Sequence, residues 1–311
     1  MFSHRPIHYR FLIDALELLS GEEGRHLAAM IRRHRRSAWL GARDPDVRFR
    51  DFHNHVVHVT DGYWGGAPRL AHRWYQRMVW AAASRDWSAA VRAAGTMVHY
   101  VTDPLHPLHT AQCDRSRRTQ LVIESIGRRY YDRWRDASNE RPGQTRWTLS
   151  NHPAWLGEAV LHGARCAHRH YGTLLHDIDV GRARLDPTES FGQRFADAHV
   201  EMVGVATTLV AAILQRAAAE MAFHNHRRSW IRLAWSTVVD GCRVPWDAWA
   251  DRRFAKQLLD YQDQPERWPE VDVVRRVMEV HDGEQRWRRH QVGRPETVNL
   301  FTPVQFVAKA A

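Results

Sequence analysis

The stretch from Gly95 to Thr110, GTMVHYVTDPLHPLHT, constrains the fold of this chain more than any other. Its apolar first half predicts a buried helix on which His99 and Asp103 lie one turn apart, on the same face. Two prolines then end the helix, because proline lacks the backbone N–H that the next turn needs. We therefore predict a helix that turns out into a loop, which carries the two further histidines His106 and His109.

Apolar residues at helical spacing recur over residues 9 to 222, and no segment shows a convincing two-residue alternation of a strand. We predict an all-α protein, a multi-helix bundle, because amphipathic helices bury their apolar stripes against one another. The predicted helices cover residues 9–35, with a break near Gly21, and residues 69–83, 87–103, 117–135, 151–175 and 186–222.

The helical pattern weakens after a basic segment at residues 224–228. From there to its end the chain is charged and punctuated by prolines. We therefore predict a helical domain over residues 1–226 and a C-terminal appendage over residues 227–311, to which the sequence assigns no role.

The composition restricts which side chains can bind a metal. Three scattered cysteines are too few for a disulfide framework or a cysteine-type zinc site, whereas 21 histidines are many for 311 residues. The net charge of +10 comes almost wholly from arginine. Such a surface attracts phosphate-bearing partners, but it also arises where arginine simply replaces lysine, so the charge does not decide between these interpretations.

The sequence predicts neither a membrane span nor a secretion signal. The longest apolar run, residues 202–214, is shorter than the roughly 18 to 20 residues that cross a bilayer. Charged residues interrupt the N-terminal segment before an apolar core of signal-peptide length is reached. We expect a soluble protein, cytoplasmic by default.

Pairs of potential metal ligands four residues apart recur in the first half of the chain. This spacing is the commonest way for a helix to direct two side chains at one ion. A single pair of this kind is more often a solvated pair or a satisfied core histidine, but the combination favours a metal site. The pairs are His4 with His8, His99 with Asp103, and Gln120 with Glu124.

Loop residues between these helices offer further donors. Asp46 lies in the sequence GARDPD, and three histidines, His53, His55 and His58, follow it. Several zinc ions held by such donors could activate a water molecule and bind phosphoryl oxygens.

The sequence HYVTDPLHPLH, residues 99–109, resembles the signature of the zinc-dependent phospholipase C family, whose all-helical fold is shared with the S1/P1 nucleases. Three outlying segments are similar to the family in the same order. They are His8 with the following Asp14-Ala15-Leu16-Glu17-Leu18, GARDPD, and Asn54-His55-Val56. The resemblance covers residues 4 to 125.

The resemblance implies a set of zinc ligands. One zinc would be bound by Asp46, His55, His99 and Asp103. Asp103 would bridge to a second zinc held by His8, and a third would lie between His109 and Glu124. Two zinc ions are thus expected, and the third site is in doubt because of Gln120.

The chain departs from the family at the third site. Where the family has a histidine four residues before the acid, this chain has Gln120, and an amide is a poor zinc ligand beside imidazole. The third site is then weak, empty, or completed by another donor nearby. The candidates are His106, Cys113 and Asp114.

Two other ligand positions have alternatives. Secreted relatives use the amino group of a processed tryptophan, which His4 could replace here. His58 or His53 could serve in place of His55, although we prefer His55.

The resemblance implies hydrolysis of a phosphodiester by a zinc-bound hydroxide, with Asp46 as ligand and proton acceptor. The substrate would be a phospholipid head group or a nucleic acid. Tyr63 and Trp64 are candidates for substrate contact, but aromatic packing explains them equally well. Glu124 favours the phospholipase, because the nucleases usually carry aspartate there. A third interpretation is a metal-binding helical protein whose catalytic site has decayed, with Gln120 as the first symptom.

Overall fold

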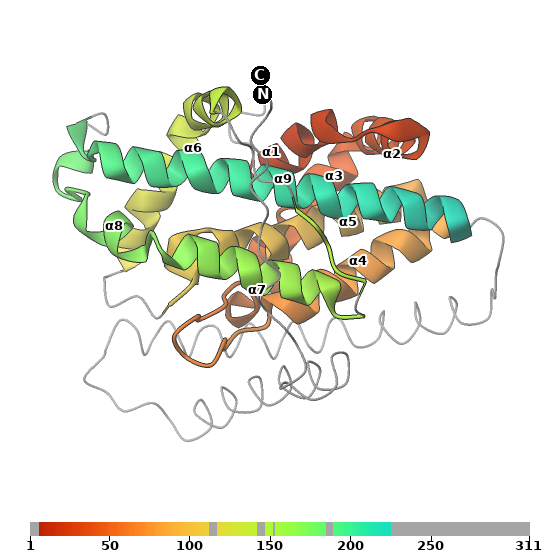
Figure 1. Ribbon diagram of the computed structural model, residues 1–311, viewed down its shortest axis with the longest axis horizontal. Helices are drawn as coiled ribbons and strands as arrows, with labels where there is room; N and C mark the ends of the chain where they lie inside the picture. Colours follow the sequence, from red (N-terminus) through yellow and green to blue (C-terminus); the bar gives the residue numbers. More distant parts are fainter. Residues whose placement is uncertain (1–5, 112–116, 142–146, 152, 185–188, 225–311) are drawn as a thin grey trace.

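A computed structural model of the protein describes residues 6–111, 117–141, 147–151, 153–184 and 189–224. Regular structure in these residues is helical, apart from two isolated bridges between single residue pairs. The predicted all-α fold is therefore confirmed (Figure 1). The predicted appendage at residues 227–311 lies outside the described residues, and the domain boundary stays a prediction.

The connections between the helices range from a single residue, His34, to the segment 42–66. The α-helices are α1 (Ile7–Ala15), α2 (Gly21–Arg33), α3 (Arg35–Gly41), α4 (Ala67–Ala83), α5 (Trp87–Thr102), α6 (Arg117–Glu140), α7 (Trp155–His168), α8 (Tyr171–His176) and α9 (Gln193–His224). Five short 3-10 turns are η1 (Leu16–Leu18), η3 (Phe52–Asn54), η4 (Asp103–Leu105), η5 (Pro107–His109) and η6 (Arg182–Arg184), and η2 (Pro45–Phe49) is a π turn.

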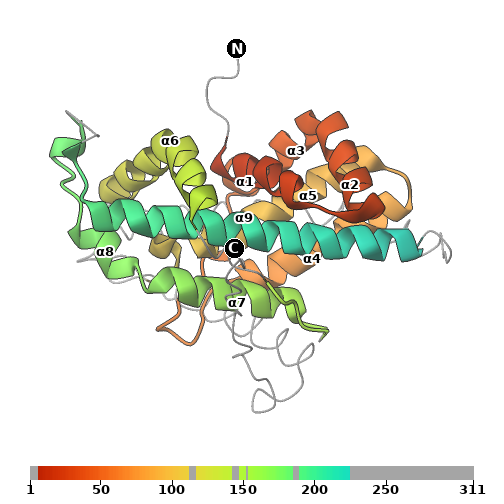
Figure 2. The same cartoon turned by 45° about the horizontal axis from the view of Figure 1, so that its top comes forward.

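Helix α5 is the centre of the bundle. Its side chains are buried almost continuously over its last ten residues, and it packs against α1, α3 and α4. Helix α9 runs along the length of the molecule and contacts α1, α2 and α6 on one side and α7 on the other (Figures 1 and 2). The apolar faces of these helices form one contiguous core. The end of α5 is thus fixed on several sides.

Both ends of α5 agree with the sequence prediction. Asp86 caps its N-terminus by accepting a hydrogen bond from the backbone N–H of Ala89, at 3.0 Å. The first of the two prolines follows directly on Asp103 and ends the helix there. His99 and Asp103 therefore lie at the point where the buried helix becomes a loop.

Two glycines let α3 lie against α5 at backbone distance. A Cβ atom added to Gly95 would lie 2.3 Å from the carbonyl oxygen of Ala38, and one added to Gly41 would lie 2.0 Å from that of Arg92. No larger side chain fits at either position unless the helices move apart. This close approach brings the residue after α3, Ala42, next to the end of α5.

Several predicted helix boundaries are wrong, because tertiary packing overrides the local pattern. The helix predicted to end at residue 35 is followed by α3, which continues to Gly41 and packs on α5. Helix α6 extends five residues beyond 135, since Ser138 near its end is buried against α9. The helix predicted over 151–175 is two helices, α7 and α8, and the second buries Leu174 and Leu175 on α9. Helix α9 begins at Gln193, later than predicted.

One helix in the described part of the chain, over Gln193–Ala222, is long and apolar enough to cross a membrane by length and composition. In its most apolar window, however, 61% of the segment is buried inside the protein. It packs along the bundle as a core helix, and it does not establish a membrane span.

Candidate metal centre

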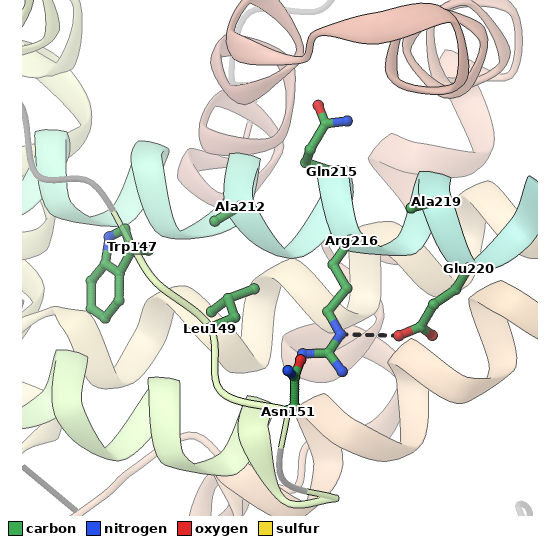
Figure 3. A pocket seen from close by; sticks show the side chains of 8 residues that line it. All are labelled: Trp147, Leu149, Asn151, Ala212, Gln215, Arg216, Ala219 and Glu220. Atoms are coloured by element: carbon green, nitrogen blue, oxygen red, sulfur yellow. Dashed lines mark hydrogen bonds and ion pairs between the residues drawn. The ribbon is translucent and has the colours of Figure 1, made fainter. Parts of the chain in front are cut away.

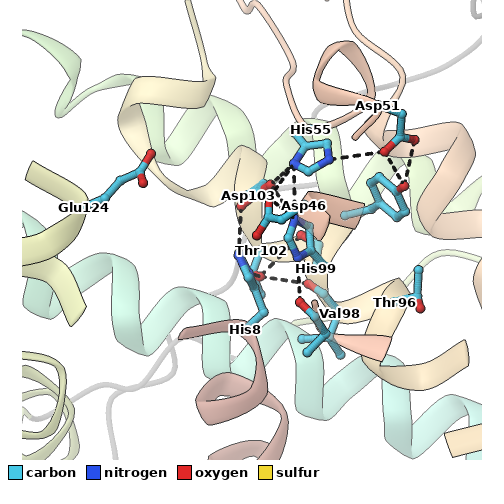
Figure 4. A network of polar contacts seen from close by, with 12 residues as sticks. His8, Asp46, Asp51, His55, Thr96, Val98, His99, Thr102, Asp103 and Glu124 are labelled. Carbon is cyan, nitrogen blue, oxygen red and sulfur yellow. Dashed lines mark hydrogen bonds and ion pairs between the residues drawn. The ribbon is translucent and has the colours of Figure 1, made fainter. Parts of the chain in front are cut away.

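Five of the predicted metal ligands converge on one point in the structure (Figure 4). They come from four parts of the chain: α1, the π turn η2, the loop after η3, and the end of α5 with the turn η4. The five residues, which we call the His/Asp centre, are His8, Asp46, His55, His99 and Asp103.

Asp103 lies between the three imidazoles. Its Oδ2 is 2.8 Å from Nδ1 of His55 and 3.1 Å from Nε2 of His99, and its Oδ1 is 3.3 Å from Nε2 of His8. One carboxylate with both oxygens in contact with different imidazoles has the arrangement expected of a bridging ligand.

Asp46 closes the centre from the solvent side. Its Oδ1 lies 3.6 Å from Nε2 of His99 and 3.8 Å from Nδ1 of His55. Its side chain is 53% exposed, whereas those of His55, His99 and Asp103 are 8% exposed or less. The centre is thus buried except on the side of Asp46, which meets solvent.

His8 and His99 each use their outer nitrogen, Nδ1, in a hydrogen bond. Nδ1 of His99 donates to the carbonyl oxygen of Ala42 at 2.9 Å, since a carbonyl can only accept. Nδ1 of His8 lies 2.7 Å from Oγ1 of Thr102, which itself donates to the carbonyl of Val98. Thr102 therefore accepts from His8, and both histidines direct Nε2 at the centre.

His55 is held the other way round, with Nδ1 facing the centre and Nε2 facing Asp51 at 3.4 Å. Asp51 is 4% exposed and accepts hydrogen bonds from the hydroxyl of Tyr100 and from Nδ2 of Asn54. The sequence prediction missed Asp51. Its spacing of four residues before His55 was the available signal.

The protonation of these groups follows from burial and from each other. Burial and the charge of His99 lower the pKa of His8 to about 3. Burial alone would lower the pKa of His55, but its hydrogen bonds to Asp103 and Asp51 outweigh it and raise that pKa to about 10. Burial would raise the pKa of Asp103, yet the histidines around it hold that pKa well below its usual range.

The donor set fits zinc. Nε2 of His99 and Nδ1 of His55 lie 3.1 Å apart, and neutral His8 directs a lone pair at the Asp103 carboxylate. A cation between these atoms relieves the repulsion between His8 and Asp103. Two groups of three donors have ligand atoms within 4.8 Å of one another: His8, Asp46 and His99, and His55, His99 and Asp103. Imidazole and carboxylate are the ligands of catalytic zinc, and outer hydrogen bonds of this kind orient them.

Within the part of the chain that the structure describes, the residues predicted for a third zinc do not form such a group. Glu124, on α6, stands apart from the His/Asp centre in Figure 4 and lies 3.7 Å from Arg128. His109 ends the turn η5, and its Nδ1 is buried with no hydrogen-bond partner among the described residues. Gln120 lies one turn before Glu124 on α6, as predicted from its spacing.

Other candidates fall outside the centre or outside the described residues. His53 is buried in η3, and His58 lies 3.5 Å from the carboxylate of Asp61 in its own turn. His106 packs against His109 and His199, with ring centroids 5.8 Å apart in each pair. Three candidate ligands lie outside the described residues: His4, Cys113 and Asp114.

Tyr63 and Trp64 lie in the loop before α4. Tyr63 packs against the core, and the backbone carbonyl of Trp64 accepts from the N–H of His58 at 2.8 Å. The ring of Trp64 lies 5.1 Å from that of His58. These contacts favour a packing role for both residues, and substrate contact stays a prediction.

A cavity of about 660 Å³ lies between α9 and the segment 147–151 (Figure 3). Its one cation, Arg216, pairs with Glu220 at 3.0 Å, donates to the carbonyl of Ser150 at 2.6 Å and stacks over Trp155. None of the candidate metal ligands that the structure describes lines it. We assign these contacts to the packing of the segment on α9.

Comparison with known proteins finds solved structures with a similar fold. No family model and no curated protein sequence matches the chain. The solved structures that are similar include an alpha toxin from Clostridium absonum, with a TM-score of 0.54 and 14% identity, and Clostridium perfringens alpha-toxin from an avian strain, with a TM-score of 0.51 and 11% identity. The alignments cover 71% and 72% of this chain but only 65% and 64% of the toxins. The likeness is one of fold.

Proposed function

We propose that this protein is a zinc-dependent phosphodiester hydrolase resembling phospholipase C. One observation carries the proposal: three imidazoles with their outer nitrogens occupied by hydrogen bonds direct their inner nitrogens at two carboxylates. The likeness in fold to the alpha toxins and the resemblance of residues 99–109 to the zinc-dependent phospholipases C support it.

The chain's own residues have distinct roles in this proposal. The three histidines and Asp103 would hold two zinc ions, which supply Lewis acidity toward phosphoryl oxygens and lower the pKa of a bound water. Asp46, whose carboxylate is exposed, would accept a proton from an attacking water. The buried side chains of His55, His99 and Asp103 keep bulk water from the inner face of the centre.

The experiment compares the wild type with Asp103→Asn, which keeps the shape of the side chain and removes its charge. We expect hydrolysis of a chromogenic phosphodiester by the zinc-loaded wild type, and a loss on the order of 100-fold or more in the variant. A matched control is Asp197→Asn, which removes an exposed carboxylate paired with Arg141. Full activity in Asp103→Asn with full zinc content would refute the role of Asp103.

Glu124 supports a phospholipid over a nucleic acid as substrate. Short-chain phosphatidylcholine and single-stranded DNA, tested side by side, separate the two. Cleavage of the DNA alone would replace the phospholipase by a nuclease of the same fold, and zinc binding without cleavage of either substrate would favour a decayed site.

A further inference from the structure

We infer that Asp51 is a positioning residue of the metal centre, which fixes His55 so that its Nδ1, and not its Nε2, binds metal. This inference rests on the proposed function, because it requires that the centre holds zinc. The evidence is a buried carboxylate that contacts His55, the adjacent Asn54, and Tyr100 next to His99.

The carboxylate of Asp51 accepts hydrogen bonds from two neighbouring side chains. The hydroxyl of Tyr100 donates to its two oxygens at 2.9 and 2.8 Å, and Nδ2 of Asn54 donates to Oδ2 at 2.9 Å. The remaining neighbour of Oδ1 is Nε2 of His55 at 3.4 Å. An ionised carboxylate can only accept, so the proton of a neutral His55 is placed on Nε2.

Fixing that proton determines the metal-binding atom. With Nε2 occupied as a donor, the lone pair of neutral His55 lies on Nδ1, which is 2.8 Å from the Asp103 carboxylate. His8 and His99 do the opposite, since their Nδ1 atoms are held by Thr102 and Ala42. The centre thus combines two Nε2 ligands with one Nδ1 ligand.

The local backbone explains why His55 needs a partner of its own. His8 and His99 lie in α-helices, whereas His55 follows the three-residue turn η3. Asp51 lies just before that turn and is anchored to α5 through Tyr100, the neighbour of His99. Asp51 therefore links the loop ligand to the rigid helix that carries the other ligands.

The test is zinc affinity in Asp51→Ala and Asp51→Asn, measured by competition with a chromophoric chelator. Removal of an outer carboxylate of this type weakens metal binding by about 10- to 100-fold. We expect that loss in Asp51→Ala, and a smaller one in Asp51→Asn, whose amide oxygen still accepts. Tyr100→Phe, which removes one donor to Asp51 and changes little volume, should weaken affinity by only a few fold.

A control separates positioning from general stability. Tyr131 donates to Asp14 at 2.8 Å in a similar tyrosine–aspartate pair that touches no candidate ligand. Asp14→Asn should lower the melting temperature of the metal-free protein but leave zinc affinity within about twofold of the wild type, because no ligand orientation depends on it.

Two spectroscopic readouts identify the atom itself. Nitrogen-15 NMR of the zinc-loaded wild type should show Nε2 of His55 protonated and Nδ1 metal-bound, and Asp51→Ala should alter the visible spectrum of the cobalt-substituted protein. Metal on Nε2 of His55, or unchanged zinc affinity in a folded Asp51→Ala, would overturn the inference. A wild type that binds no zinc would instead overturn the proposed function.

Discussion

The resemblance to the zinc-dependent phospholipases C predicted both the His/Asp centre and the pair His109 and Glu124, but the structure surrounds the two with different contacts. In the centre, every histidine has a hydrogen-bond partner on its outer nitrogen. At the pair, Nδ1 of His109 is buried without a hydrogen-bond partner among the described residues, and Glu124 lies 3.7 Å from Arg128.

This difference shows what ligand spacing alone does not provide. Residues four apart on a helix share a face, but the direction of an imidazole is set by what its second nitrogen contacts. Burial also raises the pKa of Glu124, against the opposing charges of His109 and Arg128, so its carboxylate is less ready to bind metal. We expect two tightly held zinc ions and at most a weak third.

The largest expected effect separates the two regions directly. His99→Ala removes a donor that belongs to both groups in the centre, and it should abolish tight binding of at least one zinc ion, because Nε2 of His99 binds a single ion. His109→Ala, the matched change in the other region, should leave both ions bound. Zinc content per chain after gel filtration, measured by elemental analysis, decides this. Equal losses in the two variants would mean that the regions form one site.

A substitution that adds a zinc ligand near His109 and Glu124 tests why this region differs from the His/Asp centre. Gln120→His places an imidazole one turn before Glu124 on α6, where the resembled family has its histidine. We expect a third zinc to bind, because imidazole is a far better zinc ligand than an amide. Calorimetric titration of the zinc-loaded variant should show one added site. Absence of that site would mean that His109 and Glu124 are not directed at a common point.

The smallest expected effect is a change in the melting temperature with pH. The pKa of His55 is raised from 6.5 to about 10 in the folded protein without metal. Its contribution to stability is therefore fully present below pH 6.5 and is lost as the pH rises through 10. Melting temperatures of chelator-treated protein should fall between pH 7 and 10.

Zinc binding should remove this dependence, because it requires His55 to be deprotonated already. The melting curves of the zinc-loaded and chelator-treated proteins should then diverge as the pH rises. Parallel curves over that range would show that His55 is not part of the metal centre.

Much of the fold could be predicted, because its signals are local. Asp86 and the proline after Asp103 define α5, and the pattern near Gly21 separates α1 from α2. The end of α6 and the break between α7 and α8 could not, since they depend on packing against α9, which is far away in the sequence.

The same limit applies to the site. His99, Asp103 and the order of the flanking segments pointed to the donors that converge. The hydrogen bond from His99 to Ala42 could not be foreseen, because it requires α3 and α5 to meet through Gly41 and Gly95. The choice of His55 over its two neighbouring histidines was likewise a preference until the loop was placed.

The zinc content of the wild-type protein tests the central claim most directly. Protein exposed to trace zinc and then freed of loosely bound metal should retain two zinc ions per chain, and both should be lost in Asp103→Asn. Fewer than two ions per chain in the wild type would contradict the account, because the convergence of three imidazoles and two carboxylates would then have another cause.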